Sequence, residues 1–194
     1  MDKLSYALGV GIGRQLVALG HSELQIEDFA QAVRDIMEGK KTAMDDQEAR
    51  RIVNQFLSEA EEKRTAAQKK AGEDFLKENA KRPGVHTTKS GLQYEILKEG
   101  TGRKPGRTDR VQCHYEGTLI DGTLFDSSVR RGEPAVFGVT QVIAGWVEAL
   151  QMMPEGSKWK LYIPSDLAYG AHGAGELIPP HAALVFEIEL LKVL

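Results

Sequence analysis

The stretch from Asp45 to about Ala80 contains no proline and divides this chain of 194 residues into two unlike halves. Asp45 stands three residues before Glu48, a spacing that resembles a capping box at the start of a helix. A helix of about 35 residues extends roughly 50 Å. Residues 52–60 carry a strong apolar stripe, whereas residues 61–70 have almost nothing to bury. We expect a long linking helix whose first half packs on other helices and whose middle runs through solvent.

Two shorter amphipathic helices are expected before the long one. In the first segment, apolar side chains recur at steps of three and four residues, at Leu4, Leu8, Ile12, Leu16 and Leu19. In the second they recur at Ile26, Phe29, Val33, Ile36 and Met37. These patterns predict helices over residues 3–19, stopped by Gly20, and over residues 26–38, closed by Gly39. Two helices of this size have little core, so burying both stripes needs a third element or a second copy of the chain.

Three glycines, Gly9, Gly11 and Gly13, lie inside the first predicted helix. Each costs roughly 1 kcal/mol of helix stability relative to alanine. Close approach of another helix backbone would offset this cost. A dinucleotide-binding loop is a poor alternative, because no strand precedes the segment and Leu16 stands where a third glycine would fall.

Composition limits the classes of protein to which the chain can belong. Hydrophobic residues make up 41% and charged residues 27%, as in soluble globular proteins. The net charge of −3 gives no reason to expect nucleic acid or membrane as a partner. Cys113 is the single cysteine, which excludes an internal disulfide and fits a reducing compartment. Because Arg14 interrupts the first apolar run and no cleavage pattern follows, we expect a cytoplasmic location, or a periplasmic one if the start was trimmed.

The pattern changes after Arg82-Pro83-Gly84, which ends the long helix. Large apolar side chains then alternate with polar ones, which predicts strands over residues 92–96, 111–115, 158–163 and 184–193. Asp121-Gly122 is a strong signal for a hairpin turn. We therefore predict an α+β protein. Its parts are a helical domain over residues 1–44, a linking helix over 45–82, and a mostly antiparallel sheet domain over 83–194 with one short helix after Trp146.

The sheet half lacks the usual machinery of acid–base or metal catalysis. Cys113 and His114 are neighbours on a predicted strand, so their side chains should point to opposite faces and not meet. The five histidines have no spacing that makes a metal site. Trp146, after the apolar run 142–145, is most simply a core residue. The alternative is that it forms the floor of an apolar pocket with a few polar groups, the usual form of a ligand site.

Four segments of this half, in the same order, resemble the FKBP-type peptidyl-prolyl isomerases: residues 111–128, 142–146, 168–170 and 178–182. The helical front end resembles the bacterial dimeric members of the Mip (macrophage infectivity potentiator) type. The resemblance implies a half-barrel antiparallel sheet around the short helix, and a homodimer formed through the N-terminal helices.

The resemblance also implies a site that needs no metal or cofactor. Its catalytic positions would be Tyr115, Phe125, Asp126 and Tyr169, and its substrate-binding positions Arg131, Phe137, Val142, Ile143, Trp146, Ile178 and Phe186. Trp146 would lie beneath the substrate proline ring. The Tyr169 hydroxyl and the Ile143 backbone N–H would bind substrate carbonyls. Asp126 would lie near the twisting amide, positioned by Tyr115 and Arg131.

Two residues depart from the pattern of well-studied single-domain members. Ala135 stands where they carry phenylalanine, and Ala174 stands where they carry histidine in the flap loop. Both changes are expected to open the pocket rim and to alter the preference for the residue before proline. They spare the floor, so activity should survive.

The implied activity is isomerisation of X–Pro bonds in folding proteins. The amide barrier of roughly 18–20 kcal/mol comes from resonance, so a dry pocket that favours the twisted amide can lower it without a nucleophile. The implied partners are unfolded or partly folded chains, and macrolides such as tacrolimus and rapamycin. A V-shaped dimer would engage chains by avidity across a cleft, in a chaperone-like manner. The alternative is a non-catalytic chaperone or adaptor that only binds proline-containing segments.

Overall fold

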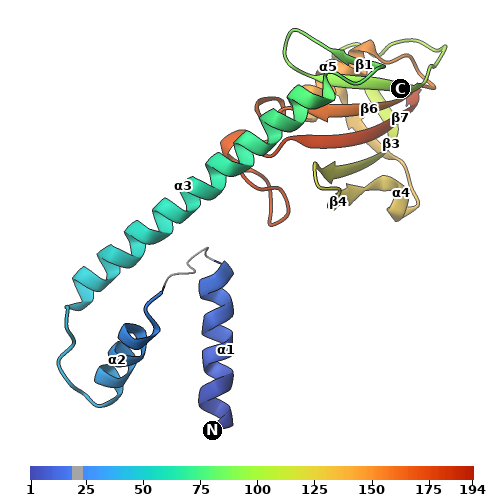
Figure 1. The fold of residues 1–194 in the computed structure, drawn as a ribbon. Helices are drawn as coiled ribbons and strands as arrows, with labels where there is room; N and C mark the ends of the chain where they lie inside the picture. The colour runs from blue at the N-terminus through green and yellow to red at the C-terminus, as the bar shows by residue number, and fades with distance from the viewer. Residues whose placement is uncertain (19–23) are drawn as a thin grey trace. The chain divides into compact units, whose positions relative to one another are not determined.

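The computed structural model describes residues 1–18 and 24–194, and its contacts divide the chain into two compact units, Met1–Arg64 and Thr65–Leu194. The first unit holds α1 (Lys3–Ala18), α2 (Ile26–Met37) and the start of α3 (Asp46–Asn79), and the second holds the sheet (Figure 1). This order of elements confirms the predicted α+β class. The predicted end of the first helix, at Leu19 and Gly20, lies outside the described residues.

The ends of α2 and α3 follow the signals in the sequence. Gly39 takes a φ of +67°, and its N–H donates to the Ile36 carbonyl while the Lys40 N–H donates to the Asp35 carbonyl. This is the Schellman arrangement, which satisfies carbonyls at the end of α2 and suits glycine. Asp45 precedes α3, and its carboxylate accepts a hydrogen bond from the backbone N–H three residues on at 2.8 Å, as predicted for a cap.

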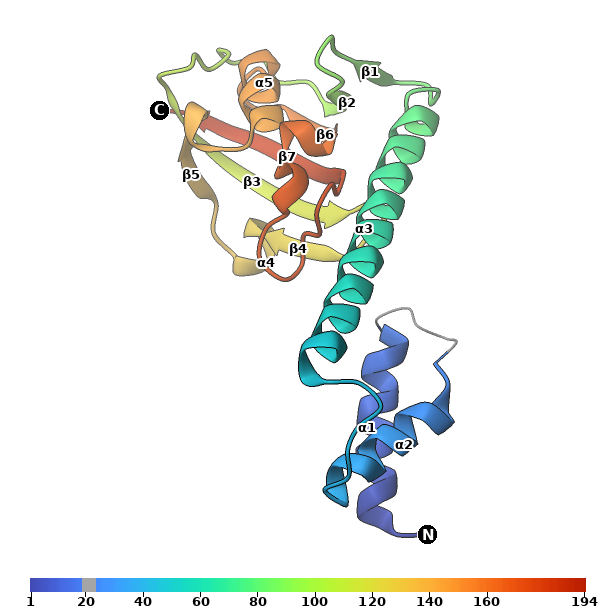
Figure 2. The same cartoon turned by 90° about the vertical axis from the view of Figure 1, so that its left-hand side faces the viewer.

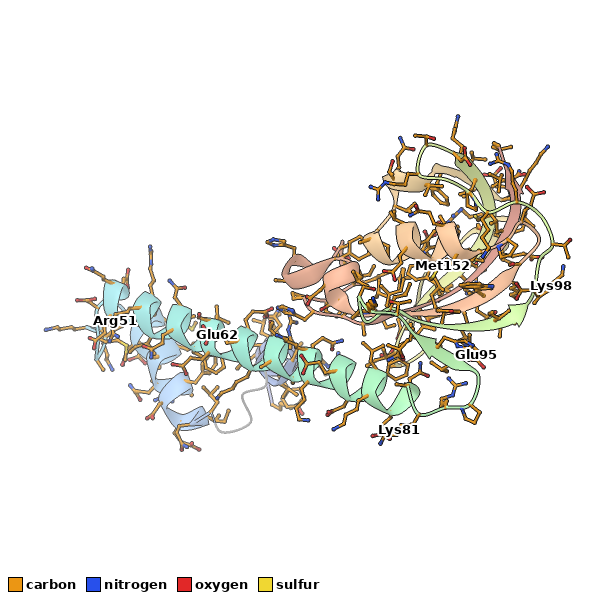
Figure 3. All side chains as sticks on the ribbon, turned by 90° about the horizontal axis from the view of Figure 1, so that it is seen from above. Arg51, Glu62, Lys81, Glu95, Lys98 and Met152 are labelled. Atoms are coloured by element: carbon orange, nitrogen blue, oxygen red, sulfur yellow. The ribbon has the colours of Figure 1, made fainter. Side chains whose placement is uncertain are left out.

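No side chain of α1 or α2 is buried within the chain. The middle of α3 is also exposed and carries ion pairs along its surface, such as Arg64 with Glu61 at 2.8 Å. Figure 3 shows side chains projecting from several sides of α3 between the labelled Arg51 and Glu62. The predicted solvated middle of the linking helix is therefore confirmed.

The second unit is built on a seven-stranded antiparallel sheet. Its strands run in the order β1 (Val85–Thr87), β2 (Gln93–Lys98), β6 (Lys158–Ile163), β7 (Leu184–Val193), β3 (Arg110–Leu119) and β4 (Leu124–Ser127), and β5 (Ala135–Gly138) also pairs with β3. Strands β2, β3, β6 and β7 correspond to the predicted strands. Strands β1 and β5 were not predicted, because three or four residues are too few to show an alternating pattern.

The predicted hairpin joins β3 to β4. The Leu119 N–H donates to the Thr123 carbonyl at 2.9 Å, and the Gly122 N–H donates back to Leu119 at 3.0 Å. Gly122 has a φ of +87°, which a residue with a side chain rarely adopts. The Asp121 carboxylate accepts from the Thr123 N–H at 2.9 Å and fixes the turn.

One short helix, α5 (Ala144–Met152), lies over one face of the sheet (Figures 1 and 2). Its buried residues include Trp146, Ala149 and Leu150, which join a core with strand residues such as Leu161 and Ile188. This matches the expected half-barrel around a short helix. The site described below lies beside α5.

The last part of α3 belongs to the sheet unit, which the sequence did not predict. Gly72 is buried, and a Cβ there would lie 3.2 Å from the Cβ of Ala183. The buried Asn79 amide donates to Gln93 at 2.8 Å. In Figure 2 the end of α3 lies beside β1 and β2. The second compact unit accordingly begins at Thr65, within the helix.

A polar cluster secures this joint. Arg82, just after α3, donates to Asn79 at 2.8 Å and to the Tyr162 hydroxyl at 2.9 Å, and it pairs with Glu95 at 3.2 Å. The Tyr162 hydroxyl in turn donates to Glu95 at 2.9 Å. Because these residues come from α3, β2 and β6, the helix end is held by several contacts at once.

Candidate functional site

A largely apolar cavity of about 700 Å³ opens beside the N-terminal end of α5. It is lined by Tyr115, Phe125, Asp126, Phe137, Gln141, Val142, Ile143, Trp146, Tyr169, Ala174, Gly175, Glu176, Leu177, Ile178 and Phe186. The structure thus brings together every predicted site residue except Arg131, which contacts the site from outside. A volume of this size suits a small ligand or a short stretch of peptide.

Trp146 has three aromatic rings standing nearly perpendicular to its indole. Tyr115 lies 5.2 Å away at 84°, Phe137 5.7 Å away at 84°, and Phe186 5.2 Å away at 85°. Edge-to-face contacts of this kind are a favoured aromatic geometry. Trp146 is 3% exposed and also lines the cavity, so it is a core residue and a surface of the pocket at once.

Two glycines allow close packing around the cavity. A Cβ on Gly145 would lie 2.6 Å from the Ile163 side chain, so only glycine lets the start of α5 approach β6 so closely. A Cβ on Gly117 would lie 2.6 Å from the Phe186 ring and 2.7 Å from the Phe125 ring. These close approaches explain why both positions lack a side chain.

The polar side of the cavity is a triad of Tyr115, Asp126 and Arg131. The Tyr115 hydroxyl donates to Asp126 Oδ2 at 2.5 Å, and Arg131 donates to Asp126 Oδ1 and to the Tyr115 hydroxyl. Asp126 is on β4, and Arg131 is in the short helix α4 (Ser128–Arg131) that follows it. Ser127 caps α4 by accepting from the Arg130 N–H, so the turn from strand to helix brings the guanidinium back to the carboxylate.

The triad keeps the Asp126 carboxyl ionised. Partial burial acts to raise the pKa of Asp126, but the hydrogen bonds from Tyr115 and Arg131 and the charge of Arg131 outweigh it, so the pKa lies below its ordinary value. Burial and the bond to Asp126 raise the pKa of the Tyr115 hydroxyl. Near neutral pH the site therefore presents a fixed carboxylate and a neutral phenol.

Two hydrogen-bonding groups at the cavity are free. Ile143 precedes α5, and its carbonyl accepts from the N–H groups of Trp146 at 2.9 Å and Val147 at 3.1 Å. Its own N–H has no acceptor among residues 1–18 and 24–194. The Tyr169 hydroxyl, on a side chain that is 38% exposed, likewise has no partner in that part of the chain. Both residues line the cavity and are available to a ligand.

A flap over residues 174–178 completes the rim. Ala174 and Ile178 exchange two backbone hydrogen bonds, at 2.9 and 3.1 Å, and the exposed residues 175–177 between them line the cavity. Gly173 (φ +63°) allows the approach, since a Cβ there would lie 2.2 Å from the Ile178 carbonyl oxygen. Sequence reasoning identified Ala174 and Ile178 here but missed residues 175–177, as it also missed Gln141.

The two alanines that depart from the family pattern lie in different surroundings. Ala174 lines the cavity, in agreement with an effect on the rim. Ala135 pairs with Cys113 between β5 and β3, packs against the core and is not among the lining residues. The structure gives no support for the expected effect of Ala135 on the rim.

The cysteine and its histidine neighbour do not form a catalytic pair. Cys113 is fully buried, and burial raises the pKa of its thiol to about 12. His114 Nδ1 lies on the other side of β3, 3.1 Å from the Ser128 hydroxyl. This confirms the predicted separation. In the described part of the chain, no three His, Cys, Asp or Glu side chains are placed to hold a metal ion.

The fold and the site agree with two family matches. Residues 101–191 match the FKBP-type peptidyl-prolyl cis-trans isomerase family, and residues 1–96 match the domain amino-terminal to FKBP-type peptidyl-prolyl isomerase. The chain therefore belongs to the FKBP-type peptidyl-prolyl cis-trans isomerases. It is an enzyme that isomerises X–Pro bonds, and the non-catalytic alternative is not favoured.

Particular relatives match both halves of the chain. The FKBP-type 22 kDa peptidyl-prolyl cis-trans isomerase of Escherichia coli K12 is 48% identical over 98% of this chain and 94% of that protein. The outer membrane protein MIP of Legionella longbeachae is 42% identical over 99% of this chain and 85% of that protein. The crystal structure of FkpA from Escherichia coli, 37% identical, covers 98% of this chain and 95% of that chain with a TM-score of 0.79.

These relatives do not support the predicted cytoplasmic location, because one of them is named an outer membrane protein. The interrupted apolar run at the N-terminus was the main basis of that prediction. Among the described helices, none has the length and apolar character needed to cross a membrane.

Proposed function

We propose that the cavity binds an X–Pro segment with the proline ring on Trp146 and favours the twisted form of the preceding amide. The observation that supports this most strongly is the arrangement of the Tyr115, Phe137 and Phe186 rings around Trp146. Such an arrangement offers apolar contact to a small, uncharged ring on several sides. A proline ring is small enough to enter it.

Catalysis follows from the difference in polarity between the planar and the twisted amide. The planar amide has charge-separated resonance, which water stabilises and which is lost on twisting. An apolar cavity withdraws that water and so favours the twisted amide relative to the planar one. Asp126, held ionised by its two partners, lies near the rotating bond and does not transfer a proton.

The two free hydrogen-bonding groups orient the chain. The Ile143 N–H and the Tyr169 hydroxyl each bind a substrate carbonyl and hold the segment while one amide rotates. Because the Ile143 donor belongs to the backbone, its role does not depend on the side chain at that position.

The second tryptophan provides a matched control for this proposal. Trp159 is also 3% exposed and stacks on Tyr94 at 4.5 Å, but it does not line the cavity. In exchange assays with a Leu-Pro peptide, we expect Trp146→Leu to lower kcat/KM on the order of 100-fold, from the loss of about 3 kcal/mol of contact with the twisted segment. Trp159→Leu should destabilise the fold and leave kcat/KM of the folded fraction near that of the unaltered protein.

Equal losses of kcat/KM in the two variants would argue against Trp146 as the floor. Tacrolimus, as a ligand of the same cavity, should inhibit exchange by the unaltered protein. It should bind Trp146→Leu more weakly than Trp159→Leu, which calorimetry can measure.

We also propose that the chain forms a homodimer through Met1–Arg64. Large apolar side chains on α1 and α2 are left uncovered, with Leu4 69%, Leu8 60% and Ile36 65% exposed. Among the residues that the structure describes, nothing lies within 4 Å of a Cβ built at Gly9, Gly11 or Gly13, which leaves space for the close approach of a second backbone. A stable solution state with this much apolar surface requires a partner.

In such a dimer, two isomerase sites would act on one unfolded chain. Binding at one site raises the effective concentration of the chain at the other, which strengthens weak binding without new contacts. We expect the dimer to catalyse proline-limited refolding of a protein substrate better than a monomeric truncation does. The two forms should act equally on a short peptide.

For location, we propose the periplasmic alternative, because a relative named an outer membrane protein is placed outside the cytoplasm by its name. Fractionation of producing cells, with the chain followed by antibody, tests it. Recovery with cytoplasmic markers alone would contradict it.

A further inference from the structure

A second cavity, of about 670 Å³, adjoins the isomerase cavity and is polar where the first is apolar. It is lined by Arg107, Thr108, Asp109, Arg110, Gly138, Thr140 and Gln141. The residues come from the loop before β3, the start of β3, the end of β5 and the 3₁₀ helix η1 (Val139–Gln141) before α5. We call it the arginine groove.

The charge of the groove is positive. The Asp109 carboxylate is paired with Arg103 at 2.7 Å and also accepts from the Gly106 N–H at 2.9 Å, so its negative charge is compensated. Arg107 and Arg110 are exposed, and neither guanidinium has an ion-pair or hydrogen-bond partner among the residues that the structure describes. The lining thus carries two arginines without partners among the described residues, in a chain whose net charge is −3.

The two cavities share Gln141. This residue lines both of them, and its side-chain oxygen accepts from the Gly138 N–H at 3.1 Å, which fixes it at their common edge. Val142 and Ile143, which follow directly, line the isomerase cavity. A bound chain that leaves the isomerase cavity across Gln141 therefore enters the arginine groove.

We propose that the arginine groove binds the carboxylate of an acidic side chain in the substrate, a few residues from the proline. Guanidinium groups present paired donors that match the two oxygens of a carboxylate. The hydroxyls of Thr108 and Thr140, also in the lining, add further donors. An extended chain advances about 3.3 Å per residue, so the acidic residue should lie at one particular distance from the proline. This proposal rests on substrate binding in the isomerase cavity.

The test compares pairs of Leu-Pro peptides in which one position, from one to four residues on either side of the dipeptide, is Glu or Gln. At low ionic strength we expect kcat/KM for the Glu peptide to exceed that for the Gln peptide about two- to fivefold at the preferred position. The ratio should fall towards one as salt is added, because a solvent-exposed ion pair is screened. In the double variant Arg107→Gln, Arg110→Gln, the ratio should be close to one at every position.

A control variant and a charge-reversal variant test whether the preference for Glu depends on the arginine groove. Lys98→Gln removes one positive charge at the exposed end of β2, at a residue that lines neither cavity, and should keep the preference for Glu (Lys98 is labelled in Figure 3). Arg110→Glu should favour a Lys peptide over a Glu peptide at the same position. Equal rates with Glu and Gln at all positions, or the same preference in the double variant, would overturn the proposal. Failure to isomerise any of the peptides would instead overturn the role of the isomerase cavity.

Discussion

Leu8 in α1 and Leu161 in β6 are both leucines of regular secondary structure, but Leu8 is 60% exposed and Leu161 is fully buried. The contrast holds across the two compact units. Met1–Arg64 leaves most of its large apolar residues exposed, whereas Thr65–Leu194 closes a core around α5. The difference indicates that the sheet unit closes a core with its own contacts, and it is the basis for the proposal that a second copy of the chain covers the helical unit.

The largest effect should come from cutting the chain on either side of the joint between α3 and the sheet. Deleting residues 1–64 removes only the helical unit, and we expect a folded monomer with unchanged activity on peptides. Deleting residues 1–80 also removes Asn79 and the half-buried Phe75, and it leaves Gln93 without its partner. This should cost the sheet unit on the order of 4 kcal/mol of unfolding free energy, measured by urea denaturation. Equal stability of the two truncations would show that the end of α3 is not part of the sheet unit.

A charge placed on the uncovered face of the helical unit should have the next largest effect. Ile12→Glu puts a carboxylate into the proposed contact between chains, and we expect the dissociation constant of the dimer to rise on the order of 100-fold or more. Gln47→Glu adds the same charge in the exposed first turn of α3 and should leave the dimer intact. Light scattering over a range of concentrations distinguishes the two. If the unaltered protein is a monomer in solution, the proposal that a second chain covers the apolar face of Met1–Arg64 is wrong.

Overpacking the joint tests how closely α3 supports the flap. Gly72→Leu forces a side chain against Ala183, five residues after Ile178 of the flap, and should lower the unfolding free energy by about 1–3 kcal/mol. The neighbouring Ala71 is exposed, so Ala71→Leu should stay within about 0.5 kcal/mol of the unaltered protein. Gly72→Leu should also change kcat/KM for peptides. If both variants behave alike, the close contact at Gly72 does not matter for stability.

The smallest effect concerns the ionisation of Asp126. Its pKa is lower in the folded protein than its ordinary value of 3.8, so its interactions stabilise the sheet unit above about pH 4, and this stabilisation is lost as the pH falls through the folded value. We expect Asp126→Asn to lower the thermal midpoint more at pH 7 than at pH 3. If the difference in thermal midpoint between Asp126→Asn and the unaltered protein does not change with pH, the charge of the carboxylate does not contribute to stability. The helical unit, which lacks this triad, should show no such dependence on Asp126.

Much of this organisation could be predicted from periodicity in the sequence. The alternation around Leu161 and the three-and-four spacing around Leu8 each identify an element, because burial on one face imposes a period. The same signal is absent from β1 and β5, which are too short. It is weak at the end of α3, where Phe75 contacts Tyr162 but the closest approach to the sheet unit is made through Gly72, which has no side chain.

The site was less accessible to sequence reasoning than the fold. Asp126 and Arg131 are ordinary charged residues in the sequence, and their pairing depends on a turn from strand to helix that has no periodic signature. Their assignment came with the family resemblance. The flap residues 175–177 lie in an irregular loop, where neither propensity nor spacing indicates which way the backbone turns.

The burial of Cys113 has a consequence for how this protein reacts with cysteines in other chains. A thiol attacks disulfides and oxidants as the thiolate, and a pKa of about 12 together with full burial leaves almost none of it. Unfolded chains carry reactive cysteines of their own. If the protein binds such chains as we propose, the burial of Cys113 prevents mixed disulfides with them, and we expect activity that does not depend on the redox potential of the surroundings.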